Sequence, residues 1–209
     1  MLFTEVVKLK DGVLYNFEYH KARVARTLAA FGMCKIDFKV IEDAVPSYCT
    51  NGLYKCRVLY SNKIEQIVFT PYVFRKIETV ELVVNNDIEY SYKYADREHL
   101  NALKAASSCD EIIIVKNGFI TDSSYTNLVL KQGKEYFTPK ECLLPGTKRR
   151  SLIDAGIIKL RSIRGCELPA YDSIHFINAM IDLEDNISCS ISSVSTSLGR
   201  GVQGECPRG

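Results

Sequence analysis

The sequence lacks any hydrophobic run long enough to cross a bilayer, because its longest apolar segments, such as 112–115 (IIIV), have the length of a strand. It also lacks an excess of one charge: 27 Lys and Arg residues stand against 25 Asp and Glu residues, a net charge of +2. A basic nucleic-acid surface is therefore disfavoured, and we expect neither a nucleic-acid nor a membrane partner. Hydrophobic residues make up 46% of the 209 residues, which excludes general disorder and allows one globular unit or two small lobes.

The eight cysteines include no C-x-x-C pair and form no cluster with histidine, so the sequence predicts no metal site. The N-terminus carries Glu5 in an alternating pattern that is typical of a strand and not of a signal peptide. Without a secretion signal, we expect reduced and mostly buried thiols in a cytoplasmic protein.

The motifs of several enzyme classes are also absent. There is no G-x-G-x-x-G after a strand, no G-x-x-x-x-G-K-[ST], no H-E-x-x-H and no G-x-S-x-G. The three histidines, at 20, 99 and 175, have no ligand spacing. Chemistry, if the chain performs any, must come from a cofactor site built by other residues.

What the sequence does contain is an alternation of strand and helix patterns. Strands at 3–9 and 13–19 flank Lys10-Asp11-Gly12, a hairpin signal. We expect helices at 20–31, 37–45, 95–107 and 147–155, and further strands at 54–60, 64–70, 78–84, 110–116, 119–121, 127–131, 134–138, 157–163 and 174–178. This order predicts an α/β or α+β fold.

The same patterns predict two lobes. We expect a small N-terminal α/β lobe at 1–85, an interlobe linker at 86–92 and a larger lobe at 93–187. The segment 188–209 is rich in Ser and Gly, and we expect it to be poorly ordered.

One candidate anion site is the segment from Pro145 to Arg150, in which Gly146 precedes a helix. A glycine lets a phosphate approach the backbone, and the amides that follow, together with the helix dipole, favour a dianion. The alternative is a plain Pro-Gly turn with a basic first helical turn.

Three more residues have side chains suited to a phosphate-bearing, electron-withdrawing cofactor. Arg23 can bind phosphate with two nitrogens, or it belongs to a solvated basic helix face. Lys93 stands between two tyrosines, where a lysine loses its proton more readily and can form a Schiff base, or it is a surface lysine. Asp122 lies in the polar run 120–127 and can pair with a protonated pyridine nitrogen, or it is part of an ordinary turn.

The order of these features is more specific than any one of them. An H-x-x-R at 20–23, a lysine before a helix, an acid five residues before Asn127 and an L-x-G-x-x-R at 144–149 resemble the class IV aminotransferases. These are the fold type IV pyridoxal-phosphate enzymes, among them branched-chain and D-amino-acid aminotransferases and 4-amino-4-deoxychorismate lyase. The resemblance runs from about residue 3 to residue 180 and implies a two-lobed fold with the cofactor site between the lobes.

The resemblance also implies roles for single residues. Lys93 matches the Schiff-base lysine, Arg23 the phosphate-binding arginine, and Asp122 the glutamate at the pyridine nitrogen, with Asn127 as the asparagine that follows it. The remaining matches are the phosphate loop at Gly146, Thr147 and Lys148, the strand end at Ile177 and Asn178 that completes the phosphate site, and Arg97, found in some lyase-like members. Arg57 is expected either to bind the substrate carboxylate or to form a cross-strand ion pair.

The chain departs from the family pattern at three points. It begins at the family's first long strand, so we expect a short member with a trimmed small lobe. Asp122 is one methylene shorter than the usual Glu, so the backbone must approach the ring more closely or a water must intervene. Thr4 is shifted relative to the threonine of the lyases, which weakens a lyase interpretation.

We therefore expect a homodimeric aminotransferase that uses pyridoxal 5′-phosphate to move an amino group between an amino acid and a 2-oxo acid. The first alternative is a 4-amino-4-deoxychorismate lyase, which forms p-aminobenzoate and pyruvate from aminodeoxychorismate. The second is a non-catalytic pyridoxal-phosphate-binding protein. The sequence does not select between L- and D-substrates.

Overall fold

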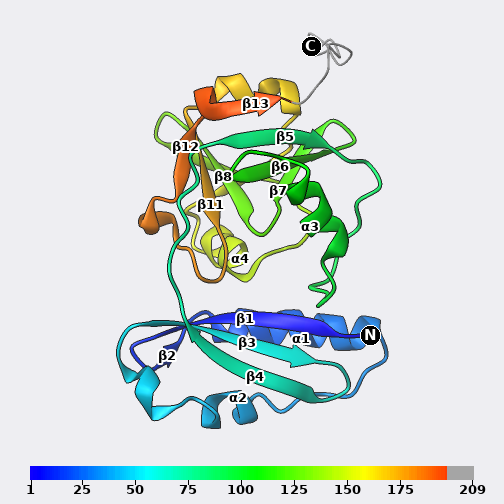
Figure 1. Cartoon of the computed structure of the whole chain (residues 1–209), viewed down its shortest axis with the longest axis vertical. Coiled ribbons are helices and arrows are strands. Elements are labelled where there is room, and N and C mark those ends of the chain that lie inside the picture. Colours follow the sequence, from blue (N-terminus) through cyan, green and yellow to red (C-terminus); the bar gives the residue numbers. More distant parts are fainter. Residues whose placement is uncertain (197–209) are drawn as a thin grey trace. The chain divides into compact units, whose positions relative to one another are not determined.

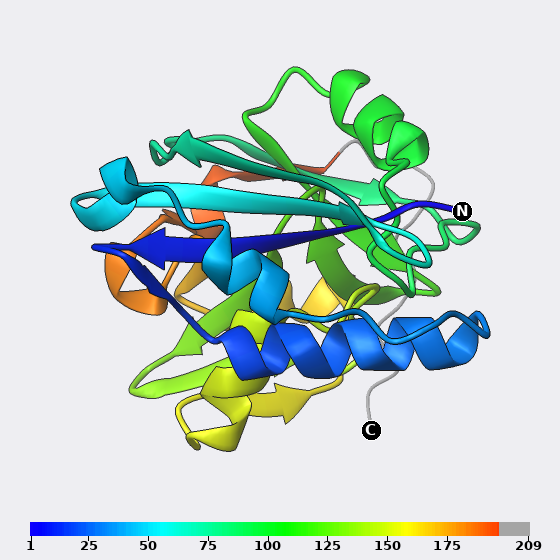
Figure 2. The ribbon, with the colours of Figure 1, turned by 90° about the horizontal axis from the view of Figure 1, so that it is seen from below.

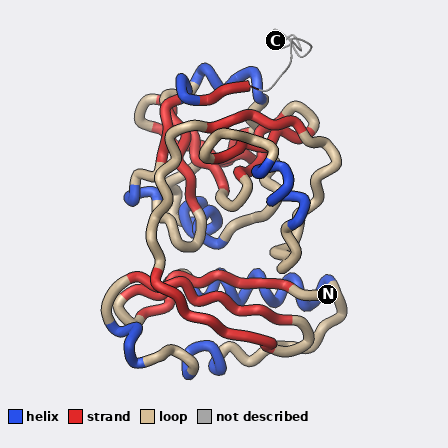
Figure 3. Tube along the Cα trace, viewed as in Figure 1, coloured by secondary structure: helices blue, strands red, loops and turns tan. Residues whose placement is uncertain are grey.

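The chain, described here for residues 1–196 by a computed structural model, divides into two compact units (Figure 1). Unit 1 comprises Met1–Phe74 and Tyr90–Asp96, and unit 2 comprises Arg75–Glu89 and the described residues from Arg97 onward. Strands predominate in both units and the helices are few and short (Figure 3). The α+β expectation is confirmed.

Unit 1 is built on one antiparallel sheet with the strand order β2-β1-β3-β4. The strands are β1 (Phe3–Lys10), β2 (Val13–Leu14), β3 (Leu53–Tyr60) and β4 (Ile64–Pro71). The turn between β1 and β2 places Asp11 (φ 49°) and Gly12 (φ 78°) in the left-handed region, as the Asp-Gly pair predicted.

The helix α1 (Phe17–Ala30) runs along one face of this sheet (Figure 2). Phe3, Val24, Leu28 and Tyr60 form the core between them. The predicted strand at 13–19 is too long, because Asn16 adopts φ 52°, which ends β2 and lets the helix begin at Phe17. Unit 1 also contains α2 (Lys39–Asp43) and the 3-10 helix η1 (Ser47–Thr50).

Unit 2 contains a mixed sheet with the path β10-β9-β8-β7-β6-β5-β13, to which β11 and β12 are added through β8. Its strands are β5 (Val80–Val84), β6 (Glu111–Lys116), β7 (Phe119–Ser123), β8 (Asn127–Gln132), β9 (Glu135–Pro139), β10 (Lys159–Arg161), β11 (Ser173–Ile177), β12 (Ser188–Ser190) and β13 (Val194–Thr196). Its helices are α3 (Glu98–Ala105), α4 (Thr147–Asp154) and the 3-10 helices η2 (Gly165–Ala170), η3 (Leu183–Asp185) and η4 (Ile191–Ser193). Ile113, Ile120, Leu128 and Phe176 are completely buried in its core.

The boundaries of the units differ from the predicted lobes. Residues 75–85, predicted for the small lobe, belong to unit 2 because β5 pairs with β6 and β13. Residues 90–96 belong to unit 1, where Tyr94 forms a β-bridge with Phe3. The predicted linker at 86–92 therefore splits between the units, and Lys93 lies in unit 1.

Two expectations about the C-terminal segment and the cysteines also need correction. The segment 188–196 is not disordered, since it forms β12, η4 and β13; the remainder of the predicted tail, 197–209, lies outside the described residues. Of the seven described cysteines, only Cys49, Cys56 and Cys189 are buried, so the expectation of mostly buried thiols is wrong for this part of the chain. None of the described helices is long and apolar enough to cross a membrane.

Candidate cofactor site

A buried carboxylate in unit 2 is bonded to the segment that leads into α4. Asp122, in β7, accepts a hydrogen bond at Oδ1 from Asn127 Nδ2 (2.7 Å) and at Oδ2 from the backbone N–H of Leu144 (2.9 Å). Asn127 Nδ2 also donates to the Leu144 carbonyl (2.8 Å). Burial raises the pKa of Asp122 to about 6, although the Leu144 amide and the Asn127 side chain oppose the increase. Asp122 and Asn127 thus fix the backbone two residues before Gly146.

Gly146 is the N-cap of α4, and no larger residue fits there. A Cβ atom added at Gly146 would lie 2.0 Å from Asn127 Oδ1, well inside van der Waals contact. Gly146 has an extended backbone (φ −70°, ψ 149°) and offers no side chain to cap the first turn, which contains no acidic residue. Because the first N–H groups of a helix have no partner within it, this N-terminus has the donors and the charge to bind an anion.

The side chains of the first turn hold α4 in place. Lys148 Nζ forms an ion pair with Asp182. Arg149 is buried and donates from Nε to Thr138 Oγ1 (3.1 Å) and from Nη2 to the Pro139 carbonyl (2.7 Å), which ties the helix to β9. Thr147 is also buried. These tertiary contacts therefore anchor the predicted phosphate loop. Its backbone N–H groups belong to the first turn of α4.

The end of β11 lies beside these residues. Ile177 is paired with Asn127 in the antiparallel register of β11 and β8. Asn178 follows and accepts hydrogen bonds at Oδ1 from the backbone N–H groups of Met180 (2.8 Å) and Ile181 (3.1 Å). The structure therefore brings the predicted carboxylate, phosphate loop and strand end together in unit 2.

The two arginines predicted to contact substrate have different surroundings. Arg97 Nη2 donates to the Ser124 carbonyl (2.5 Å), while Glu111 Oε1 accepts from the Ser124 N–H (3.1 Å), so both hold the turn that follows Asp122. Arg57 is exposed on β3 and forms no ion pair with any described residue, so the cross-strand pair is not formed. A substrate role for either arginine stays a prediction.

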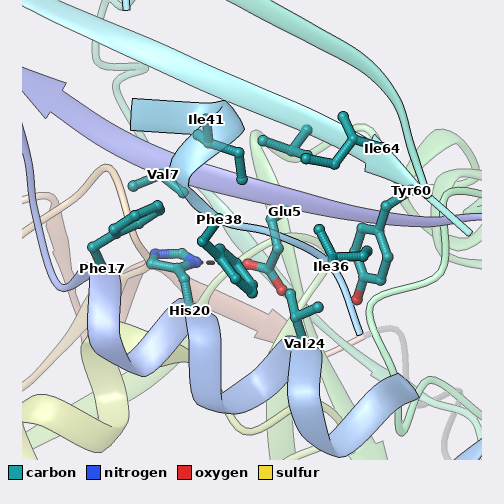
Figure 4. A pocket seen from close by; sticks show the side chains of 11 residues that line it. Glu5, Val7, Phe17, His20, Val24, Ile36, Phe38, Ile41, Tyr60 and Ile64 are labelled. Carbon is teal, nitrogen blue, oxygen red and sulfur yellow. Dashed lines mark hydrogen bonds and ion pairs between the residues drawn. The ribbon is translucent and has the colours of Figure 1, made fainter. Parts of the chain in front are cut away.

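In unit 1, Arg23 belongs to a buried polar cluster with Glu5 and His20. Arg23 donates to Glu5 from Nε (2.8 Å to Oε1) and from Nη2 (2.5 Å to Oε2), and His20 Nδ1 lies 2.6 Å from Glu5 Oε2. Burial raises the pKa of Glu5, but the Arg23 charge and the His20 hydrogen bond outweigh it and bring that pKa to about 2. Figure 4 shows Glu5 on β1 facing His20 on α1.

Lys93 lies in the same unit as this cluster. Its carbonyl accepts the backbone N–H of Thr4 (2.9 Å), which joins the 90–96 segment to the start of β1. Burial lowers the pKa of His20, Glu5 opposes this, and the charges of Arg23 and Lys93 lower it further. Lys93 and Arg23 therefore lie in the same unit.

Sequence reasoning missed Glu5, although a signal was present. Glu5 lies at every second position with Phe3, Val7 and Leu9, so its carboxylate is on the same, core-facing side of β1 as these buried side chains. A charge at such a position needs a partner, and Arg23 is the nearest cation that a helix packed on that face can supply. Leu144 and Arg149 are part of the L-x-G-x-x-R motif, but the sequence did not show their contacts, because their partners lie on other strands.

Comparison with known proteins identifies the family of this chain. The family described as amino-transferase class IV matches residues 91–183. An uncharacterized protein of Haemophilus influenzae is 37% identical over 182 residues, covering 84% of this chain and 96% of that protein. A crystal structure from Haemophilus somnus 129PT, provisionally described as a 4-amino-4-deoxychorismate lyase, is 31% identical, has a TM-score of 0.78 and covers 87% of this chain and 97% of its own.

A more distant structure shows the same fold. A pyridoxal-phosphate-bound protein of Mycobacterium tuberculosis, described as a hypothetical aminotransferase, has a TM-score of 0.73 at 16% identity and covers 86% of this chain and 78% of its own. The fold is thus that of the fold type IV pyridoxal-phosphate enzymes. The chain belongs to the class IV aminotransferase family and is a pyridoxal-phosphate-dependent enzyme.

Proposed function

We propose that this chain is an aminotransferase that binds pyridoxal 5′-phosphate and moves an amino group between an amino acid and a 2-oxo acid. The observation that carries the proposal is the bonded link in unit 2 between a buried carboxylate and a helix N-terminus. Asp122 and Asn127 both bond to Leu144, two residues before the N-cap Gly146. A phosphorylated pyridine needs an acceptor at its ring nitrogen and donors at its phosphate, and these residues supply both.

The residues present fit the phosphate. The first turn of α4 carries no acidic side chain, and the Lys148 side chain is occupied by Asp182, so the backbone amides of Thr147 and Lys148 are the groups that would bind the dianion. Ile177 and Asn178 would border the phosphate beside them. Arg23 stays a further predicted ligand of the phosphate.

The residues also fit the ring. Each Asp122 oxygen accepts one protein hydrogen bond and keeps a further lone-pair direction, so the carboxylate can still accept a proton-bearing ring nitrogen. Asn127 holds Asp122 in that orientation. A pyridinium beside Asp122 would favour the ionised form and lower the pKa of this carboxyl below about 6.

Lys93 would attach the cofactor covalently and, once displaced by the amino donor, carry a proton between two carbon atoms of the substrate–cofactor pair. The bound cofactor supplies the electron-withdrawing ring that makes this proton removable.

The test is covalent trapping. Purified protein that has been supplied with pyridoxal phosphate should absorb in the blue-violet, and borohydride should fix the cofactor on Lys93, as read by peptide mass spectrometry. Lys93→Ala should lose both signals, while Lys104→Ala, which replaces a lysine of α3, should keep them. Unchanged absorbance and trapping in Lys93→Ala would refute the assignment.

A second candidate, 4-amino-4-deoxychorismate lyase, is favoured by the provisional description of the Haemophilus somnus relative. The Thr4 hydroxyl does not help this candidate, because it donates to the Val58 carbonyl within the sheet (3.2 Å). The two reactions differ in what they consume. Pyruvate release from aminodeoxychorismate without an amino acceptor would select the lyase, and conversion of the cofactor to its amino form by an amino acid would select the transaminase.

A further inference from the structure

Glu5, His20 and Arg23 form a charged cluster in the middle of a hydrophobic layer. Their exposed fractions are 2%, 1% and 8%, and the side chains around them include Val7, Val24 and Tyr60. An ion pair in such a place costs desolvation that its own attraction often fails to recover. The stability of unit 1 alone therefore does not explain why these charged residues are buried there.

The cluster is not a binding pocket of its own. The cavity beside Glu5 and His20 has a volume of about 10 Å³ and is otherwise lined by aliphatic and aromatic side chains (Figure 4). Such a volume holds one water at most. The polar groups must act on one another, or on a ligand that meets the cluster from another side.

The hydrogen bonds of the cluster leave one edge of Arg23 available. A guanidinium has five N–H groups. Glu5 accepts one from Nε and one from Nη2, and within residues 1–196 it is the only acceptor of the Arg23 side chain. Both N–H groups of Nη1 and the second N–H of Nη2 remain, and together they form a fork that matches a phosphate.

His20 fixes the carboxylate in turn. Glu5 is ionised at neutral pH and can only accept, so the His20 Nδ1 that lies 2.6 Å away carries the hydrogen. Glu5 Oε2 thus accepts from both His20 and Arg23, and Oε1 accepts from Arg23 alone. With three donors on two oxygens, the carboxylate and the guanidinium have one mutual orientation.

We propose that Glu5 is a positioning residue for the cofactor phosphate: it holds Arg23 by its Nε–Nη2 edge, so that the Nη1–Nη2 edge is the one that meets the phosphate. The inference rests on the proposed function, because it takes the phosphate of pyridoxal phosphate as the ligand of Arg23. Glu5 itself touches no cofactor. Without Glu5, Arg23 would rotate freely and its fork would lose its direction.

The experiment compares pyridoxal phosphate with pyridoxal, which lacks the phosphate. We expect Glu5→Gln to weaken binding of pyridoxal phosphate to the apoprotein about tenfold and binding of pyridoxal less than about twofold, as measured by absorbance titration. Arg23→Gln should show the same selective loss, and the double variant should lose no more than Arg23→Gln alone. Glu18→Gln, an exposed glutamate on the same helix, should bind both compounds like the wild type.

Equal losses for the two compounds, no loss, or additive losses in the double variant would overturn the role of Glu5 while leaving the proposed function intact. Failure of the wild type to bind pyridoxal phosphate at all would overturn both. Circular dichroism would show whether Glu5→Gln folds. If it does not, the role of Glu5 can be tested by NMR of wild-type protein in which the arginine side chains carry nitrogen-15. The Arg23 Nε–H resonance should stay unchanged when pyridoxal phosphate is added and its Nη1 resonance should shift; a large shift of Nε–H would mean that Arg23 leaves Glu5, against the proposal.

Discussion

Glu5 and Asp122, two of the buried carboxyl groups in residues 1–196, have opposite properties. Glu5 contacts a guanidinium, and its pKa falls to about 2 although burial alone would raise it. Asp122 accepts hydrogen bonds from neutral donors, among them the Asn127 side chain and the Leu144 N–H, and burial raises its pKa to about 6. A positive charge in contact with a carboxyl group therefore lowers its pKa more than burial raises it, whereas neutral hydrogen-bond donors lower it less than burial raises it. Glu5 suits a fixed ion pair, and Asp122 suits a group that becomes fully ionised when a cation binds.

The pKa of Asp122 has a consequence for the stability of the protein without cofactor. Because the folded-state pKa (about 6) lies above the ordinary value (3.8), the folded state binds this proton more tightly, and the resulting stability is present below pH 3.8 and lost as the pH rises through about 6. From these values, the free energy of unfolding should fall by about 2 kcal/mol between pH 4 and pH 6.5 on account of this group. Urea denaturation of Asp122→Asn should lack this dependence.

The matched control is Asp87→Asn, which changes an exposed aspartate of unit 2 and should follow the wild type at every pH. Parallel pH curves for the wild type and Asp122→Asn would contradict the expectation. In the holoenzyme, Asp122→Asn should also slow the half-reaction with an amino acid.

At the scale of elements, α4 is held from three directions and so presents its N-terminus in one position. Asp122 and Asn127 bond to the backbone before it, Arg149 bonds to β9, and Lys148 pairs with Asp182. These contacts come from β7, β8, β9 and the segment after β11. An eight-residue helix has little stability of its own, so tertiary contacts rather than helix propensity determine where its amides point.

The close approach of Gly146 to Asn127 gives a direct test of this arrangement. Gly146→Ala places a Cβ where Asn127 Oδ1 lies, so either the side chain or the start of α4 must move. We expect a loss of about 1–3 kcal/mol in the free energy of unfolding and a clear decrease in affinity for pyridoxal phosphate. The first is measured by urea denaturation and the second by absorbance titration.

Gly165→Ala is the matched control, since a Cβ there would meet Val115 at 3.6 Å, an ordinary contact. Gly165→Ala should leave both the free energy of unfolding and the affinity for pyridoxal phosphate close to those of the wild type. A Gly146→Ala protein with the stability and cofactor affinity of the wild type would show that the start of α4 is not constrained by Asn127.

At the scale of the whole molecule, the chain passes from unit 1 to unit 2, returns for residues 90–96 and then completes unit 2. This short return places Lys93 beside β1 and in the same unit as Arg23. Lys93, which would attach the cofactor, and Arg23, which would bind its phosphate, thus belong to one structural unit, although they are 70 positions apart in the sequence.

The family resemblance further predicts a homodimer. Sedimentation equilibrium of the purified protein should give twice the mass of one chain, independent of loading concentration in the micromolar range. A mass of one chain across that range would contradict the expectation, and the trapping experiment on Lys93 would remain interpretable because it needs no particular oligomeric state.

The sequence by itself determined the local elements and the family. Turn residues such as Asp11-Gly12, strand alternation and helix stops are encoded within a few neighbouring positions, so most helices and strands were predictable, and the ordered series from Arg23 to Arg149 was specific enough for the resemblance. Only the tertiary structure decided that β5 joins unit 2, that Glu5 holds Arg23, and that Asp122 holds Leu144. Those contacts join residues 18 or more positions apart, and their energies depend on burial and direction, which no local pattern records.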